Sequence, residues 1–387
     1  MNIVTLSFAY LRDRALTMAL NLVMLALGIG TIVVVILFGA QLESRLTRDS
    51  RGFDLVIGAK GSPLQLILST LYHADAPIGN VPLDDANEVA HNGLVATAIP
   101  IALGDNYRDF RVVGTEPSYA QHYGAKIAQG RFWQAPLEAT LGAEAARITG
   151  LRVGDNFSAQ HGFVQGGQTR ESAPYVVVGI LAPTGTVLDR LILTSVESAW
   201  QVQAVPVHEI TALLITYRTP LAAAMLPRLV NGHTALQAAS PAYETARLLS
   251  LVGVGIGTLR AFGILLIACA ALGAFIALYN ATSERRYDIA VMRSLGASRG
   301  RVLREVMLEG LLLALGGILL AFALGHGIAA LLGEFSSEAR ALGLSGLVWR
   351  ADEGWLIVLA LSAGAAAAFV PALLAYRVDI AHTLAGD

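Results

Sequence analysis

The feature that most constrains this chain is a set of four long stretches that contain no Asp, Glu, Lys or Arg. A helix that crosses a bilayer needs about 20 consecutive, mostly apolar residues, because it rises about 1.5 Å per residue across a hydrocarbon core of about 30 Å. The stretches that meet this length are residues 15–42, 261–283, 310–333 and 354–376. The sequence therefore predicts four transmembrane α-helices.

The composition agrees with a membrane protein. Hydrophobic residues make up 55% of the 387 residues and charged residues only 14%, against about 25% charged residues in soluble domains. The formal net charge of -2 excludes a basic nucleic-acid-binding protein. A single cysteine, Cys269, excludes an internal disulfide and a multi-thiolate metal site.

Arginines indicate the orientation of the spans, because positive charges beside a span are retained on the cytoplasmic side. Residues 284–305, between the second and third stretches, carry six arginines against three acidic residues. Residues 334–353, between the third and fourth, carry four acidic residues against two arginines. Both termini are therefore predicted to be cytoplasmic, in agreement with Arg12 and Arg14 before the first span.

These observations give a domain organisation in which a large domain follows the first span. The predicted parts are a cytoplasmic N-terminus (1–14), span one (15–42), an extracytoplasmic domain (43–240), a stalk helix with span two (241–283), a cytoplasmic coupling loop (284–309), span three (310–333), a short outer loop (334–353), span four (354–376) and a cytoplasmic C-terminus (377–387). A helix over residues 241–283 would be about 64 Å long and would extend beyond the bilayer. Gly253, Gly255 and Gly257 weaken a helix, so stalk and hinge both remain open.

The extracytoplasmic domain alternates strand-like and helix-like segments. The segments typical of strands are 53–57, 95–103, 107–113, 175–181, 191–194 and 210–217. The segments typical of helices are 63–72, 137–148 and 221–230. Turns are expected at Gly154 and Gly185. An α+β domain is therefore predicted.

Within the spans, Ala360, Gly364 and Ala368 recur every four residues, a spacing that lets helices approach closely. No charged residue lies inside a span, so an ion pathway has no candidate residues. His326 is best explained by a hydrogen bond to a neighbouring helix.

The segment from Glu284 to Ser298 is the most specific motif of the chain. Ile289, Met292 and Leu295 fall three apart and would form one apolar face of a short cytoplasmic helix. Gly296 can end this helix, and Ser298 can cap the next one. Such a helix can present apolar side chains to a partner groove, or it can be an ordinary basic loop on lipid headgroups.

This motif resembles that of the MacB/FtsX-like permeases, the membrane subunits of one class of ABC transporter. The matching residues are Glu284, Arg285, Arg286, Ile289, Arg293, Leu295, Gly296, Ala297, Ser298 and Glu309. Asp288 stands where the family usually has Glu. The ending, with Pro371-Ala372, Ile380-Ala381 and Leu384, is similar to the family's carboxyl end. The turn and strand residues of the outer domain, Val153-Gly154-Asp155 among them, resemble the family's periplasmic core domain.

The resemblance implies an inner-membrane permease whose helix 286–295 is a coupling helix that docks on a separate ABC ATPase subunit. The implied coupling residues are Glu284, Arg285, Arg286, Ile289, Met292, Arg293, Leu295, Gly296, Ala297 and Ser298. It also implies three kinds of partner: a second permease chain, a periplasmic adaptor or substrate-binding protein, and the surrounding membrane lipid. ATP hydrolysis would move the outer domains, a process called mechanotransmission. ATP and Mg would be bound by the partner, and no cofactor by this chain.

Enzymatic and metal sites have little support in the sequence. The chain has two lysines, Lys60 and Lys126, and no G-x-x-x-x-G-K-[ST] motif, so it is not expected to hydrolyse ATP. His73 and Asp75 lack a third metal ligand at a suitable spacing. For the transporter itself, three functions remain open: export or efflux, lipoprotein release, and signalling to a cell-wall hydrolase. The apolar segment 64–72 could equally pack in the core of the outer domain or accept a lipid-like tail.

Overall fold

The computed structural model describes residues 15–162, 174–203, 208–336, 339 and 344–378. The predicted N-terminus, with Arg12 and Arg14, and residues 379–387 of the predicted C-terminus, with the residues 380–384, lie outside these residues. The chain divides into two compact units, each with hydrophobic clusters of its own. One is a helical unit, Met1–Leu42 with Val252–Asp387, and the other is an outer unit, Glu43–Leu251.

Among the residues that the structure describes, four long helices are apolar enough to cross a membrane, as the sequence predicts. They are α2 (Ala15–Asp49), α9 (Pro241–Glu284), α11 (Arg299–Phe335) and α13 (Gly354–Tyr376). A short helix, α10 (Arg286–Ser294), precedes α11, and a 3-10 turn, η2 (Ala351–Glu353), precedes α13. The helices continue past the uncharged stretches, since α2 ends at Asp49 and α11 already begins at Arg299. Polar residues continue a helix when its backbone hydrogen bonds can still form, so charge alone does not mark helix ends.

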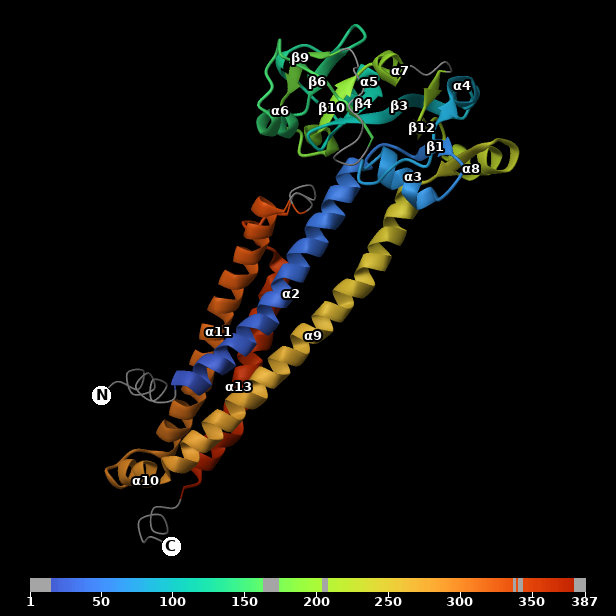
Figure 1. The fold of residues 1–387 in the computed structure, drawn as a ribbon. Helices are drawn as coiled ribbons and strands as arrows, with labels where there is room; N and C mark the ends of the chain where they lie inside the picture. The colour runs from blue at the N-terminus through green and yellow to red at the C-terminus, as the bar shows by residue number, and fades with distance from the viewer. Residues whose placement is uncertain (1–14, 163–173, 204–207, 337–338, 340–343, 379–387) are drawn as a thin grey trace. The chain divides into compact units, whose positions relative to one another are not determined.

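The long helices of the helical unit are drawn in Figure 1, and small residues bring them together. A Cβ atom on Gly364 of α13 would lie 2.9 Å from the carbonyl oxygen of Gly310 and 2.6 Å from the Ala314 side chain of α11. Ala360 and Ala368, one turn away on either side, are fully buried. In a membrane, where the hydrophobic effect does not drive helix association, such close approach provides the packing energy.

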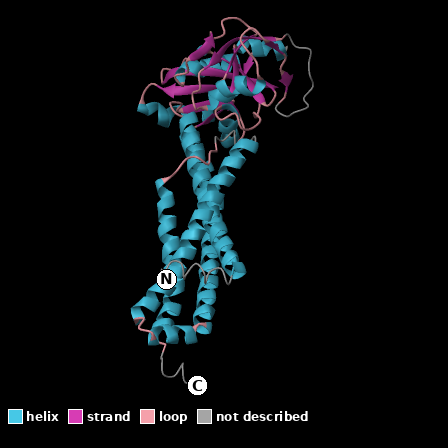
Figure 2. Cartoon of the chain, turned by 90° about the vertical axis from the view of Figure 1, so that its left-hand side faces the viewer, coloured by secondary structure: helices cyan, strands magenta, loops and turns pink. Residues whose placement is uncertain are grey.

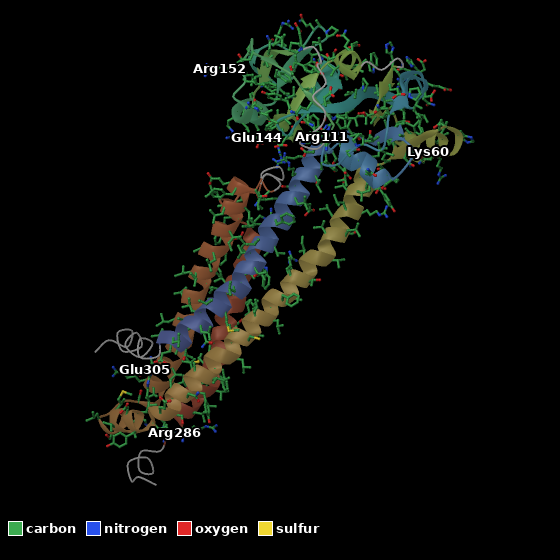
Figure 3. The ribbon with its side chains drawn as sticks, viewed as in Figure 1. Lys60, Arg111, Glu144, Arg152, Arg286 and Glu305 are labelled. Carbon is green, nitrogen blue, oxygen red and sulfur yellow. The ribbon has the colours of Figure 1, made fainter. Side chains whose placement is uncertain are left out.

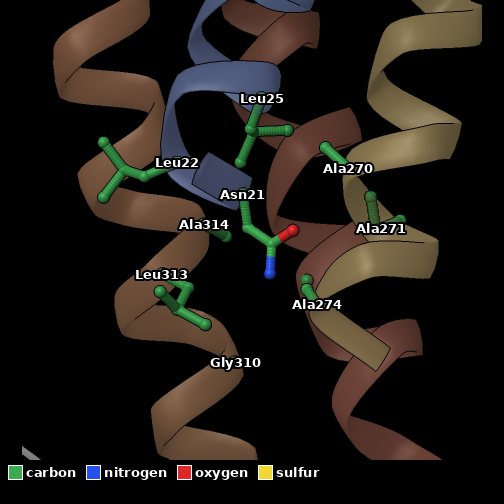
Figure 4. A pocket seen from close by; sticks show the side chains of 11 residues that line it. Asn21, Leu22, Leu25, Ala270, Ala271, Ala274, Gly310, Leu313 and Ala314 are labelled. Atoms are coloured by element: carbon green, nitrogen blue, oxygen red, sulfur yellow. The ribbon is translucent and has the colours of Figure 1, made fainter. Parts of the chain in front are cut away.

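One polar side chain inside this unit was not anticipated from the sequence. Asn21 of α2 is 8% exposed and lines a small hollow between α2, α9, α11 and α13 (Figure 4). Its Nδ2 has no hydrogen-bond partner among the described residues, and its Oδ1 occupies the space that a Cβ on Gly273 would need. An amide carries no charge, which is why a search for charged residues passes over it.

The outer unit is built on a mixed sheet, drawn in magenta in Figure 2. Over the described residues its strands follow the order β13-β1-β12-β3-β4-β10-β6-β9-β5, with β7 beside β9 and β8 beside β3, while β11 pairs with β2 separately. The strands are β1 (Leu55–Ala59), β2 (Val81–Pro82), β3 (Val95–Tyr107), β4 (Phe110–Thr115), β5 (Ile127–Gly130), β6 (Glu138–Leu141), β7 (Asn156–Phe157), β8 (Gln160–His161), β9 (Tyr175–Leu181), β10 (Leu191–Thr194), β11 (Glu209–Ile210), β12 (Ala212–Tyr217) and β13 (Leu236–Ala239). The β10–β4 and β6–β9 pairs are parallel, and the other pairs are antiparallel.

Helices cover both faces of this sheet, because successive side chains of a strand point to opposite faces. The remaining helices are α3 (Pro63–Thr70), α4 (Leu83–Ala90), α5 (Pro117–His122), α6 (Ala143–Thr149), η1 (Val187–Arg190), α7 (Val196–Gln203) and α8 (Pro220–His233). Val56 of β1 packs in the cluster that contains α3 and α5, whereas its neighbours Leu55 and Ile57 pack with α4, α7 and α8. The α+β class predicted for this domain is therefore present.

One expectation for the outer unit was wrong. The segment 137–148, predicted as one helix, is strand β6 followed by α6, because Glu138–Leu141 pairs with β9 and β10. Gly142 separates the two, where a Cβ would collide with the carbonyl oxygen of Leu188. Of the two roles left open for the segment 64–72, core packing is present, since Leu66, Ile67 and Leu71 are buried in the core. The turns at Gly154 and Gly185 are confirmed by positive φ angles of 98° and 68°.

Candidate functional site

The candidate site is α10, the short helix between α9 and α11. Arg285 occupies its N-cap position, and Leu295 its C-cap position. Gly296 follows with φ of +100°, the left-handed conformation that glycine adopts without strain. The N–H of Gly296 donates to the Arg293 carbonyl and that of Ala297 to the Met292 carbonyl, both at 3.1 Å. This pair of bonds is the Schellman motif, so the helix ends where the sequence predicts.

The next helix begins where the sequence places its cap. Ser298 is the N-cap residue of α11 and has the extended backbone of such a residue. Its side chain makes no capping hydrogen bond. The position was therefore predicted correctly, and the side-chain bond was not.

The inner face of α10 packs on the other helices of its own unit. Ile289, which is 5% exposed, belongs to a buried cluster, and Met292 packs against that cluster. The cluster contains Val302 and Val306 of α11 together with Ala372 and Ala375 of α13. Ile289 and Met292 therefore hold α10 in place; Ile289 is buried, and Met292 remains half-buried.

The three apolar residues predicted to share a partner-facing surface are thus divided between two faces, which corrects the sequence-based expectation. Leu295 is 83% exposed and Tyr287 is 61% exposed. Val291 lies between them at the i+4 spacing, so Tyr287, Val291 and Leu295 form an outer apolar face, half-buried at Val291. Tyr287 was not among the predicted residues, although the spacing of four residues between 287, 291 and 295 is visible in the sequence.

Two polar contacts tie the ends of α10 to neighbouring helices. The Arg285 guanidinium lies 3.3 Å from the Glu309 carboxylate of α11. Arg293 donates to the carbonyl oxygen of Val378, just after α13. Glu284 and Arg286 are exposed at the start of the helix, and Figure 3 labels Arg286. The predicted coupling residues are therefore contiguous at one end of the helical unit.

Charged and ionisable groups border the spans more closely than the sequence suggests. Glu309 is 5% exposed inside α11, and Glu353, immediately before α13, is fully buried. His326 holds Glu353 through its Nε2 at 3.0 Å and the carbonyl oxygen of Gly346 through its Nδ1 at 2.7 Å. His326 therefore has the hydrogen-bonded structural role expected for it.

Three histidines of the outer unit, His73, His122 and His208, have aromatic partners. His122 stacks on Phe53 with ring centroids 3.9 Å apart, and His208 stacks on Trp200 at 4.2 Å. The Nε2 of His73 lies 3.3 Å from the Tyr119 hydroxyl, and burial, with the nearby Arg111 charge, lowers the pKa of His73 to about 3. Among the described residues, no group of three or more His, Cys, Asp or Glu side chains is placed to hold a metal ion.

A tyrosine of the outer unit joins the ends of two long helices. The Tyr72 hydroxyl, just after α3, donates to the carbonyl oxygen of Leu46 in α2 at 3.2 Å and lies 2.5 Å from the Thr245 hydroxyl in α9. Burial raises the pKa of Tyr72, so the hydroxyl keeps its proton. The sequence offers no pattern that would identify this contact, because its members lie far apart along the chain.

Comparison with known proteins gives two matching family models. The MacB-like periplasmic core domain matches residues 18–226, and the FtsX-like permease C-terminal domain matches residues 260–380. Among solved structures, the periplasmic region of MacB from Actinobacillus actinomycetemcomitans is similar at 12% identity and a TM-score of 0.36, over 51% of this chain and 95% of that chain. The extracellular domain of the noncanonic ABC-type transporter YknZ from Gram-positive bacteria is similar at 12% identity and a TM-score of 0.31, over 48% and 98%. A search of curated proteins found no match.

Proposed function

The chain belongs to the MacB/FtsX-like family of ABC transporter permeases, and we propose that it couples ATP hydrolysis by a separate ATPase subunit to movement of its outer unit. Permeases of this family are inner-membrane subunits with a periplasmic domain; they are not enzymes themselves and work with ABC ATPases. In the proposal, both termini and α10 are cytoplasmic, the outer unit is periplasmic, and a second permease chain completes the transporter. Export or efflux is the proposed outcome.

The observation that carries the proposal is the way α10 is held. Its inner face is buried against α11 and α13, and Arg285 and Arg293 fix its two ends. A helix attached in this way cannot rotate or slide without breaking these contacts. A load applied by the ATPase to the outer face, formed by Tyr287, Val291 and Leu295, would therefore pass to α11 and α13.

The length and continuity of α9 support transmission beyond the bilayer. The helix has 44 residues, about 66 Å at a rise of about 1.5 Å per residue, which is roughly twice the hydrocarbon thickness. It is unbroken at Gly253, Gly255 and Gly257, and a Cβ at any of these would meet open space. In the proposal, α9 therefore acts as the stalk.

The test compares residues on the two faces of α10. Leu295→Asp should abolish copurification of the ATPase with a tagged full-length chain, because a carboxylate would replace an exposed apolar contact. Its thermal unfolding should not change, since the side chain is 83% exposed. Met292→Asp should instead lower the unfolding temperature, because it places a charge beside a buried cluster.

Leu347→Asp is the matched control, because Leu347 is 93% exposed and lies before η2, away from α10 in the sequence. It should retain the ATPase. If Leu295→Asp also retains the ATPase and its stimulated hydrolysis, the coupling proposal is wrong. Copurification of an adaptor would support export, whereas a bound lipoprotein or a cell-wall amidase would replace export with one of the two alternatives.

A further inference from the structure

A small hollow lies beside α10, and most of the charged groups in its lining are acidic. It is formed by the end of α9, by α10 and by the first turns of α11, and encloses about 380 Å³ including space open to solvent. Asp288, Glu305 and Glu309 contribute carboxylates, and Arg285 is the one cation in its lining among the described residues. When all four are ionised, the lining has an excess of negative charge.

Glu305 is the group in this hollow whose hydrogen bonding is incomplete. It lies on α11 (labelled in Figure 3) and is 8% exposed. Its Oε1 is buried and accepts no hydrogen bond from any described residue. Arg285 and Arg301 act on it through their charges, but neither donates to this oxygen. A buried carboxylate oxygen without a hydrogen-bond donor destabilises the folded chain.

Glu309 differs from Glu305, although both line the same hollow. The Oε1 of Glu309 already accepts from Arg285 at 3.3 Å. The hollow therefore has one satisfied ion pair and one carboxylate that lacks a donor. Met292, on its wall, offers a thioether against which the aliphatic part of a long side chain can pack.

We propose that this hollow receives a basic side chain, Arg or Lys, of the ATPase subunit, whose charged end binds Glu305. The inference rests on the proposed function, because α10 must face the ATPase. Asp288, exposed on α10, is the first carboxylate that an approaching cation meets. A guanidinium is the better match, since its several donors can reach Glu305 and Asp288 together. The surrounding loop is rich in arginine, so the hollow is a local acceptor on a surface that otherwise repels basic groups.

The first experiment measures whether the hollow attracts cations in the chain alone. Cys269 is the single cysteine, so a Cys269→Ser background permits one new thiol, either Met292→Cys inside the hollow or Leu295→Cys outside it. The rates of reaction with a cationic and an anionic methanethiosulfonate reagent are compared for the full chain in nanodiscs. Their ratio is used because nearby carboxylates slow both reagents by disfavouring the thiolate.

The cationic-to-anionic ratio should be several-fold higher at position 292 than at 295. Glu305→Gln should reduce it at 292 and leave it unchanged at 295. Equal ratios at the two positions, or a ratio at 292 that does not respond to Glu305→Gln, would overturn the proposal. Thermal unfolding of each variant shows whether the fold is retained.

The second experiment tests the partner. Glu305→Gln should weaken association with the copurifying ATPase about ten-fold or more, the effect of losing a charged hydrogen bond. Glu144→Gln in the outer unit is the matched control, because Glu144 also has a buried Oε1 without a described partner. If Leu295→Asp abolishes association but Glu305→Gln leaves it unchanged, the basic side chain does not bind here and the coupling function stands. If both variants associate normally, both proposals are wrong.

Discussion

Replacing Tyr72 with Phe removes a single hydroxyl that links α2, α3 and α9 within the outer unit. The hydroxyl makes two contacts, with the Leu46 carbonyl at 3.2 Å and the Thr245 hydroxyl at 2.5 Å. Each such hydrogen bond contributes about 1 kcal/mol net, and Thr245, which is 7% exposed, would keep a poorly satisfied hydroxyl. We therefore expect Tyr72→Phe to destabilise the outer unit by about 2 kcal/mol. For a domain of roughly 200 residues this corresponds to a decrease in Tm of about 4–8 °C.

The assay is a double-mutant cycle with Thr245→Val, measured by thermal unfolding and by hydrogen exchange in peptides that cover residues 43–72 and 241–251. If the hydroxyls bond to each other, the double variant should lose about 1 kcal/mol less than the sum of the single variants. Amide hydrogen exchange should become faster in both peptides. It should remain unchanged around β9, because the hydrogen bond between Tyr72 and Thr245 does not involve that strand. A coupling energy near zero would refute the contact and, with it, the role of Tyr72 in joining the two long helices.

Three further predictions concern pH and backbone conformation. The pKa of His73 is about 3 in the folded chain, against an ordinary 6.5, so the unfolded state binds a proton at a higher pH than the folded state. The free energy of unfolding should therefore fall by about 1.4 kcal/mol per pH unit as the pH decreases from 6.5 toward 3. His73→Gln should flatten this slope in unfolding curves measured between pH 6.5 and 4.5. The hydrogen bonds from Arg131 lower the pKa of Glu138 from 4.5 to about 2, so their stabilisation is present above pH 4.5 and is lost as the pH falls to 2. Glu138→Gln should therefore be less stable than the unchanged chain at pH 6, and the difference should be much smaller at pH 2.5. Gly296→Ala should destabilise the chain by about 1–2 kcal/mol through its φ of +100° alone, because a Cβ there meets open space. Gly300 is equally unobstructed but helical, so Gly300→Ala should be neutral or stabilising. Equal effects of the two substitutions on stability would contradict this explanation.

Local sequence patterns predicted those parts of the fold in which a segment strongly prefers one backbone conformation. The predicted strands 175–181 and 191–194 coincide with β9 and β10, because both are short β-branched or aliphatic runs that are bounded by turn residues. Gly296 was predicted to end α10 because a left-handed residue is needed there. The segment 137–148 was mispredicted because its alanines favour helix while strand pairing of Glu138–Leu141 prevails.

The orientation of α10 illustrates a different limit. Periodicity in the sequence identifies apolar residues but not the surface that covers them, and α10 has apolar residues on two sides. Ile289 and Met292 pack on α11 and α13, whose cluster residues are distant in sequence. Tyr287 and Leu295 remain exposed. Only the tertiary packing separates the residues that hold the helix from those that can bind.

The carboxylates near α10 connect this packing with the proposed function. Burial of a carboxylate destabilises the folded chain unless a cation pairs with it, and this applies to both Glu305 and Glu309. Glu309 is compensated by Arg285, which at the same time fixes the start of α10 to α11. Glu305 would be compensated by the proposed partner cation. A cation bound there would add a contact between α11 and the ATPase beside the apolar contact at Leu295. A movement of the ATPase would then displace α10 and α11 together. Transmission through this end of the helical unit requires such a joint displacement.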